Sequence, residues 1–151
     1  IINLQGDEPN IDSNDLKHLN KLIDLNKPEI GTMAARIEDK SKLNDDNVVK
    51  VITEDQITDK NFPAALDFKR EINKEITNIY HHIGIYAYKP KILKKIIKFK
   101  QTKNEIKNRL EQLRAMENRI KINVALAKFS PIGVDTMEDY LALKKNLEYK
   151  S

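Results

Sequence analysis

Hydrophobic residues along the chain recur at two spacings, one typical of strands and the other of helices. Leu16, Leu19, Leu22 and Ile23 fall on one face of a helix, and Asp12 stands where an N-terminal cap is expected. Elsewhere apolar and β-branched residues alternate or run together, as they do in strands. The pattern predicts strands at 1–5, 32–37, 47–52, 80–88 and 120–126, and helices at about 12–26, 90–99, 102–118 and from 136 onward.

Proline, glycine and capping residues set the expected helix boundaries. Pro28 and Gly31 are expected to end the first helix, and Pro90 is tolerated as the first residue of the second. Thr102 and Glu105 form a capping-box pattern at the start of the third. The predicted inward residues are Ile92, Leu93, Ile96 and Ile97 in the second helix, Ile106, Leu110 and Leu113 in the third, and Tyr140, Leu141 and Leu147 in the last, after a cap-like Thr136 and Asp139.

Strands separated by helices predict an α/β fold. Residues 53–78 have no clean period and are expected to hold irregular structure or an excursion from the main sheet. No repeat, low-complexity tract or Gly/Ser linker divides the chain, so residues 1–151 are expected to form one domain.

Composition narrows the class of protein. The 151 residues are 40% apolar and 33% charged, as in a globular domain, and the absence of cysteine excludes disulfides, zinc-thiolate sites and cysteine nucleophiles. The chain lacks an apolar run long enough to span a membrane and the basic start of a signal peptide, so we expect a cytoplasmic protein without membrane insertion. Ile1 in place of methionine suggests a chain that begins partway through a longer one.

The net charge of +4 raises a competing hypothesis, because basic proteins attract nucleic acid and anionic membranes. Only five of the 27 cationic residues are Arg, which base-edge and phosphate recognition favours, and the other 22 are Lys. Lys, Asn and Ile are all abundant, as codons rich in A and T predict. We therefore favour composition bias over nucleic-acid binding as the source of the charge.

Polar residues beside glycines mark the first candidate chemistry. Three of the four glycines lie in Gln5-Gly6-Asp7, His82-Ile83-Gly84 and Gly133-Val134-Asp135. Glycine permits close approach of a ligand to the backbone, and α/β sheets bind ligands beyond the carboxyl ends of their strands. Asp7 and Asp135 at such positions would suit Mg²⁺, which prefers oxygen ligands. The alternative is that both are turn and cap residues.

The histidines and the Glu111-Gln112 pair give further candidates. His18 is expected on the polar face of the first helix, whereas strand alternation requires either His81 or His82 to face inward, as a hydrogen-bonded core residue rather than a metal ligand. Glu111 and Gln112 diverge by about 100° on a helix and are expected in solvent unless that helix ends near a cleft. The sequence has no nucleophile elbow, phosphate loop or zinc-protease motif.

Four ordered segments resemble the motifs of one enzyme family. They are Asn3–Pro9 (NLQGDEP), His82–Tyr88 (HIGIYAY), Leu110–Glu117 (LEQLRAME) and Pro131–Thr136 (PIGVDT), and Asn47–Val51 (NVVKV) also fits. They are similar to the motifs of the 3-deoxy-manno-octulosonate cytidylyltransferases, also called CMP-Kdo synthetases. The resemblance spans nearly the whole chain and is weakest between residues 53 and 78.

The resemblance implies a nucleotide-diphospho-sugar transferase-like α/β fold, a mixed sheet flanked by helices. It implies a magnesium-dependent reaction of CTP with 3-deoxy-manno-octulosonate (Kdo), giving CMP-Kdo and pyrophosphate for lipopolysaccharide synthesis, and a homodimer. It also implies that Asp7 and Asp135 bind Mg²⁺ and act in catalysis, that Arg70 meets the sugar carboxylate through a bidentate guanidinium contact, and that the sugar site holds Gln5, His82, Tyr86, Glu111 and Gln112.

One part of the family pattern has no counterpart in the sequence. The Pro-Ala-Arg segment and the Lys-containing loop that bind the CTP triphosphate and base are absent, so roughly the first third of the family's length, with its nucleotide-binding strands, is expected to be missing. Three hypotheses remain open: an enzyme that needs the missing segment, a non-catalytic remnant that binds a sugar or a partner, and a basic nucleic-acid-binding protein.

Overall fold

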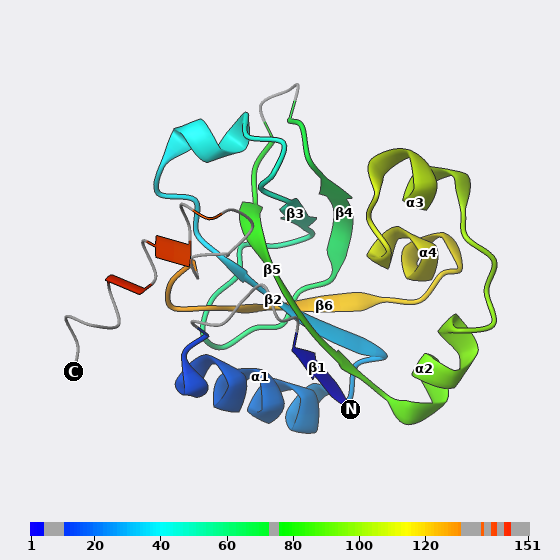
Figure 1. Ribbon diagram of the computed structural model, residues 1–151. Coiled ribbons are helices and arrows are strands. Elements are labelled where there is room, and N and C mark those ends of the chain that lie inside the picture. Colours follow the sequence, from blue (N-terminus) through cyan, green and yellow to red (C-terminus); the bar gives the residue numbers. More distant parts are fainter. Residues whose placement is uncertain (5–10, 73–75, 131–136, 138–139, 142–143, 146–151) are drawn as a thin grey trace.

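The computed structural model of the chain describes residues 1–4, 11–72, 76–130, 137, 140–141 and 144–145. It contains both strands and helices, which pack as one sheet flanked by helices (Figure 1), and this confirms the predicted α/β class. In chain order the elements are β1 (Ile2–Leu4), α1 (Ser13–Asn26), β2 (Ile30–Ala35), the 3₁₀ helix η1 (Lys40–Leu43), β3 (Lys50–Thr53), β4 (Ala65–Lys69), β5 (Ile79–Tyr88), α2 (Pro90–Ile96), α3 (Lys103–Asn108), α4 (Gln112–Glu117) and β6 (Ile122–Leu126).

The described strands form one mixed sheet around β5. The order is β4-β3-β5-β2-β6, with β1 also paired to β5. β2 and β6 run parallel, and the other strand pairs in the described part of the chain are antiparallel. β5 is ten residues long and pairs with β2 along one edge and with β3 and β1 along the other. The predicted strand at 80–88 is therefore the central strand of the sheet.

Each face of the sheet is covered by its own helices. Leu19 and Leu22 of α1 pack with Met33, Ile83 and Ile85 in one hydrophobic cluster. On the other face Leu110 and Leu113, from the α3–α4 pair, belong to a cluster that also contains Val51, Phe68, Tyr80 and Tyr86. Figure 1 shows α1 and the α3–α4 pair on different sides of the sheet. Because strand side chains alternate between faces, the residues of β5 divide evenly between the two cores.

The first helix begins as predicted but ends for a different reason. The Asp12 side chain accepts a hydrogen bond from Asn14 N at 2.8 Å, and the helix ends at Asn26 because Lys27 takes a left-handed conformation with φ of 49°. The expectation that Gly31 helps to end the helix was wrong. Gly31 lies inside β2, where a Cβ atom would stand 3.0 Å from Phe62 Cζ, so a larger residue would have to displace the Phe62 ring slightly.

The predicted helix at 102–118 is two helices. Its start was predicted correctly, since the Thr102 and Glu105 capping box is present, but Arg109 takes a φ of 53° and ends α3. The break turns the second helix so that Leu110 and Leu113 are buried while Ile106, predicted to face inward, is 60% exposed. The helix predicted at 90–99 likewise ends at Ile96, and Ile97 is 68% exposed instead of inward.

Two further segments depart from the expected boundaries. The stretch without a clean period contains β4, which pairs antiparallel with β3 at the edge of the sheet, so the expected excursion is an added strand. In the predicted last helix Tyr140 and Leu141 are helical but exposed, and Thr136, Asp139 and Leu147 lie outside the described residues. Among the helices that the structure describes, none is long and apolar enough to cross a membrane.

Candidate functional site

β5 carries the residues from which the candidate site is built. His82, Tyr86 and Tyr88 are separated by even numbers of residues and therefore share one face of the sheet; we call them the β5 aromatic row. The ring centroids of His82 and Tyr86 are 5.4 Å apart, and Tyr88 stacks on Tyr86 at 5.9 Å. Phe68 of β4 meets the His82 ring edge-on at 5.1 Å. Of the two histidines, His82 is thus the one that faces inward among aromatic side chains.

The aromatic row is uncharged at neutral pH. Burial lowers the pKa of His82 to about 3, with a smaller contribution from nearby His81. Burial also raises the pKa of Tyr86 well above its usual value, and raises the pKa of Tyr88 to about 12. In each case the physical cause is that the charged form loses more hydration on burial than the neutral form does.

The Tyr86 hydroxyl is the clearest sign of a binding function in this row. The side chain is 7% exposed, and its buried hydroxyl has no hydrogen-bond partner among the residues that the structure describes. Buried hydroxyl groups are nearly always paired, because leaving one unpaired costs about 1–3 kcal/mol. A ligand hydroxyl or carboxylate at this position would satisfy it.

Glu111 acts electrostatically on the aromatic row from the neighbouring helix pair. Its charge contributes to the raised pKa of both Tyr86 and Tyr88, which puts the carboxylate within electrostatic reach of both phenols. The break at Arg109 places Glu111 directly before α4 and makes Gln112 the first residue of that helix. Glu111 is exposed, as predicted, whereas Gln112 is half-buried rather than in solvent. The break thus supplies the helix end that a site role for this pair requires.

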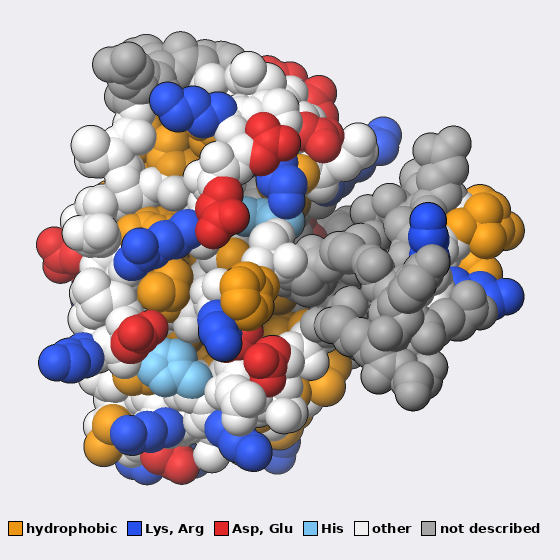
Figure 2. All heavy atoms as spheres, turned by 90° about the vertical axis from the view of Figure 1, so that its left-hand side faces the viewer, with side chains coloured by type: hydrophobic (Ala, Val, Ile, Leu, Met, Phe, Trp, Pro, Cys, Tyr) orange, Lys and Arg blue, Asp and Glu red, His pale blue; other side chains and the backbone are white. Residues whose placement is uncertain are grey.

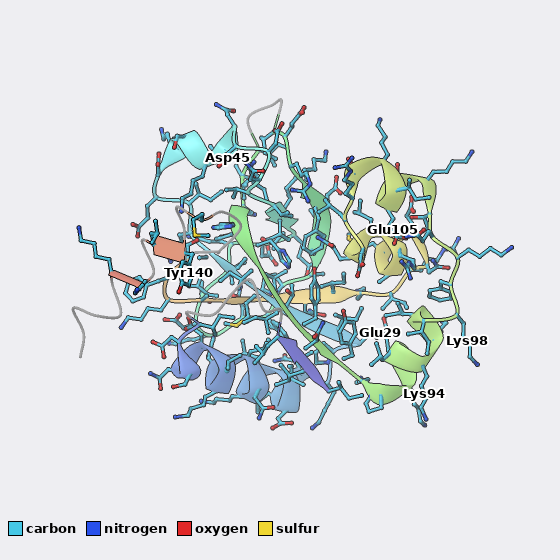
Figure 3. All side chains as sticks on the ribbon, in the orientation of Figure 1. Glu29, Asp45, Lys94, Lys98, Glu105 and Tyr140 are labelled. Atoms are coloured by element: carbon cyan, nitrogen blue, oxygen red, sulfur yellow. The ribbon has the colours of Figure 1, made fainter. Side chains whose placement is uncertain are left out.

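An ion pair fixes the relative position of α3 and α4. The Glu105 carboxylate, 3% exposed, accepts hydrogen bonds from Arg114 Nε at 2.8 Å, from Arg114 Nη2 and from Thr102 N at 3.1 Å. Figure 3 shows Glu105 between the two helices. The hydrogen bonds from Arg114 hold the pKa of Glu105 below its usual value. Because the pair spans the break, it also holds the start of α4 in place.

Arg70 lies on the same side of the sheet as the aromatic row, but its guanidinium is hydrogen-bonded to backbone carbonyls. It follows Phe68 by two residues, and its guanidinium donates to Asp46 O at 2.9 Å and to Asn108 O at 3.2 Å. Fully buried Lys50 donates to Arg70 O and, at 2.7 Å, to Asp45 O. Within the described residues, Arg70 makes no hydrogen bond to the aromatic row or to Glu111 and Gln112.

The predicted metal residues cannot be placed. Asp7 and Asp135, together with Gln5, lie outside the described residues, and the part of the chain that is described contains no group of three or more His, Asp or Glu side chains suited to a metal. His81 Nδ1 contacts the hydroxyl of Ser130, a residue that precedes Asp135 by five positions. Burial, with the charges of Lys42 and Lys50, lowers the pKa of His81 to about 4. His81 therefore links β5 to the chain that leads toward Asp135.

Some residues around the site were not predicted from the sequence. Tyr88 could have been found, because it has the same parity as Tyr86 in the strand. Lys50 in Val48-Val49-Lys50-Val51 also carried a signal, since a cation inside a β-branched run needs buried partners. Thr32 gave no signal, and His18, expected on the surface, is half-buried with Nε2 unpartnered within the described part of the chain.

Comparison with known proteins shows the family to which the chain belongs. A family model described as cytidylyltransferase matches residues 1–122. The 3-deoxy-manno-octulosonate cytidylyltransferase of Bartonella tribocorum is 37% identical over 148 residues, and that of Thermodesulfovibrio yellowstonii is 40% identical over 160 residues; each match covers 97% of this chain. A solved structure of CMP:2-keto-3-deoxy-manno-octonic acid synthetase complexed with CTP matches with a TM-score of 0.86 and 27% identity, covering 99% of this chain and 62% of the other.

The mixed sheet and its two helical layers are those of an α/β protein of the nucleotidyltransferase class. Within that class, the chain belongs to the cytidylyltransferase family. It spans about 60% of the length of the curated relatives it matches.

Proposed function

We propose that this chain carries the sugar-binding half of a 3-deoxy-manno-octulosonate cytidylyltransferase. The observation that carries the proposal is the β5 aromatic row: among the described residues the buried Tyr86 hydroxyl has no hydrogen-bond partner, His82 is neutral, and the Glu111 carboxylate acts electrostatically on Tyr86. Tyr86 and His82 offer hydrogen bonds without a net charge at the centre of the site. Such a site suits a ligand rich in hydroxyl groups, and two similar proteins are named for the sugar acid 3-deoxy-manno-octulosonate.

The proposed reaction joins CTP and Kdo. The anomeric hydroxyl of the sugar attacks the α-phosphorus in line, a new carbon–oxygen–phosphorus link forms, the bond from the α-phosphorus to the bridging oxygen breaks, and pyrophosphate leaves while the hydroxyl proton is lost. Catalysis of this kind rests on positioning and on neutralising phosphate charge. CMP-Kdo would serve lipopolysaccharide synthesis, and we infer a cytoplasmic homodimer that neither binds nucleic acid nor inserts into membranes.

The residues divide between two substrates in this proposal. Gln5, His82, Tyr86, Glu111 and Gln112 would bind the sugar, and Arg70 its carboxylate. Asp7 and Asp135 would hold Mg²⁺, for which two carboxylates are a suitable donor set, and the metal would neutralise charge on the CTP phosphates. Arg70 would have to exchange at least one backbone carbonyl for the sugar carboxylate, which is chemically favourable because a charged acceptor binds guanidinium more strongly.

The test separates binding from turnover. Kdo titrated into the chain should shift the NMR signals of His82 and Tyr86, and Tyr86→Phe should weaken binding about tenfold, whereas exposed Tyr140→Phe should leave it unchanged. A chimaera should be made by joining this chain to the part of a curated relative that the match does not cover. With CTP, Kdo and Mg²⁺, this chimaera should release pyrophosphate. A folded chimaera without turnover would favour the non-catalytic binding module, and a chain that does not bind Kdo would refute the proposal.

A nucleic-acid-binding function is less well supported. In Figure 2 cationic and anionic side chains are interspersed over the face in view rather than gathered by sign. Figure 3 shows Lys94 of α2 and Lys98, which follows the end of that helix, pointing away from the sheet. Affinity for nucleic acid that falls steeply with salt would revive this alternative.

A further inference from the structure

Thr32 contacts the site histidine from the neighbouring strand. It is fully buried in β2, and the pairing of β2 with β5 shifts immediately beyond it, from Thr32 with Tyr86 to Met33 with Ile83. The shift leaves two residues of β5, at 84 and 85, as a bulge. The Thr32 hydroxyl oxygen then lies 2.7 Å from Ile85 O and 3.0 Å from His82 Nε2.

These two contacts determine which nitrogen of His82 carries the proton. A threonine hydroxyl has a single proton to donate, and a backbone carbonyl oxygen can only accept. At 2.7 Å the proton goes to Ile85 O, so the lone pairs of the hydroxyl remain for His82. A contact of 3.0 Å between Nε2 and those lone pairs is a hydrogen bond only if Nε2 is the donor.

We infer that Thr32 is a positioning residue that holds neutral His82 as the Nε2–H tautomer, so that Nδ1 is left as a hydrogen-bond acceptor for a hydroxyl group of the ligand. The contact that the described residues make with a ring nitrogen of His82 is at Nε2 and not at Nδ1. Phe68 and Tyr86 pack against the ring and fix its orientation. The low pKa of His82, about 3, agrees with a ring that stays neutral and keeps this acceptor at physiological pH.

The inference has two parts with separate tests. The tautomer concerns this chain alone, whereas the identity of the hydroxyl donor, a polyhydroxylated sugar acid, rests on the proposed function. A tautomer that differs from the inferred one would overturn the inference even if the chain binds Kdo. If the chain does not bind Kdo, the ligand part of the inference and the proposed function are both refuted. The NMR spectra of the chain without ligand still decide the tautomer.

The tautomer is read by long-range ¹H–¹⁵N correlation spectra of the ¹⁵N-labelled chain near neutral pH. His82 should show a protonated, pyrrole-type Nε2 and an unprotonated, pyridine-type Nδ1. Thr32→Val keeps the shape but removes the acceptor, and it should give a mixed or reversed tautomer; Thr32→Ser restores the hydroxyl and should restore the single tautomer. Thr58→Val, at an exposed threonine, is the matched control. A wild-type Nδ1–H tautomer, or one unaffected by Thr32→Val, would overturn the inference.

The ligand part is tested by adding Kdo to the same samples. Binding should move the Nδ1 signal of His82, and Thr32→Val should weaken binding roughly tenfold, the value of about one hydrogen bond, while Thr32→Ser stays within about twofold of wild type. If Kdo binds and the Nδ1 signal does not move, Nδ1 is not the acceptor. If Thr32→Val is unfolded by circular dichroism, Thr32→Ser and the wild-type tautomer still decide the question.

Discussion

Mild acid should destabilise this fold through His81 and His82. Burial lowers their pKa values in the folded chain to about 4 and about 3, against 6.5 for an unperturbed histidine. The unfolded chain therefore takes up protons on these residues as the pH falls below 6.5, while the folded chain does not until pH 4 or lower. The free energy of unfolding therefore keeps its full value above pH 6.5. It falls progressively as the pH drops, toward pH 4 for His81 and toward pH 3 for His82.

The magnitude follows from the difference in bound protons. Between pH 7 and pH 5 each histidine gains about 0.7 proton in the unfolded state alone, which lowers the free energy of unfolding by about 2 kcal/mol, or about 4 kcal/mol for both. Domains typically have only about 5–15 kcal/mol in total. Asp39 and Glu105, whose pKa values lie below their usual 3.8 and 4.5, lose their contribution only at lower pH.

Urea unfolding at both pH values, followed by circular dichroism, measures this loss. His81→Gln and His82→Gln should each remove about half of the drop in unfolding free energy between pH 7 and pH 5, and the double variant should remove nearly all of it. Lys94→Gln, at an exposed cation on α2, should leave the drop unchanged. A double variant that loses as much stability as the wild type would show that burial of these two rings does not control the acid response.

Three further substitutions test the supports of the site. Glu105→Gln removes the charge from a buried acceptor that binds Arg114 and Thr102 N, and it should lower the unfolding free energy by about 2 kcal/mol in urea titrations. Asp24→Asn, in an exposed pair 3.9 Å long, should change the unfolding free energy by less than about 0.5 kcal/mol. Lys50→Met removes the hydrogen bond that Lys50 donates to Arg70 O, and it should weaken Kdo binding, measured by calorimetry, at least fivefold. Lys69→Met, at an exposed residue, should leave Kdo binding unchanged. Asp135→Asn should abolish pyrophosphate release by the chimaera and leave the melting temperature within about 2 °C of the unsubstituted chimaera, since a carboxylate that binds metal contributes little to the fold. If the variant does not fold, Asp135 is a cap residue instead.

The parts of the fold that could be predicted are those with a local signal. The β5 strand alternates over ten residues, and Asp12 and Thr102 cap helices through side chains visible in the sequence. The break at Arg109 had no such signal, because the left-handed conformation there is adopted by an arginine rather than a glycine. Tertiary packing of Leu110 and Leu113 on the sheet overrides the helical period that would have placed Ile106 beside them.

The candidate site shows the same division. Strand alternation was enough to predict that one of His81 and His82 faces inward, and the spacing of four to Tyr86 would have placed Tyr86 on the face of His82. The approach of Glu111 depended on the helix break, and the contact of Thr32 with His82 depended on a bulge between strands 50 residues apart in sequence. Such contacts depend on register between distant segments, which no local pattern records.

The distribution of charge in the site gives the strongest physical reason for the type of ligand proposed. The buried centre is neutral: His82 and both tyrosines stay uncharged near pH 7, and burial is the main cause in each case. The charged candidates that the structure describes are less buried, with half-buried Arg70 beyond the end of β4 and exposed Glu111 ahead of α4. A polyanion would bring charges to a centre that has none to neutralise them, and their desolvation would oppose binding. A sugar acid would instead present hydroxyl groups to the neutral centre, and its single carboxylate would be left for the cation at the edge.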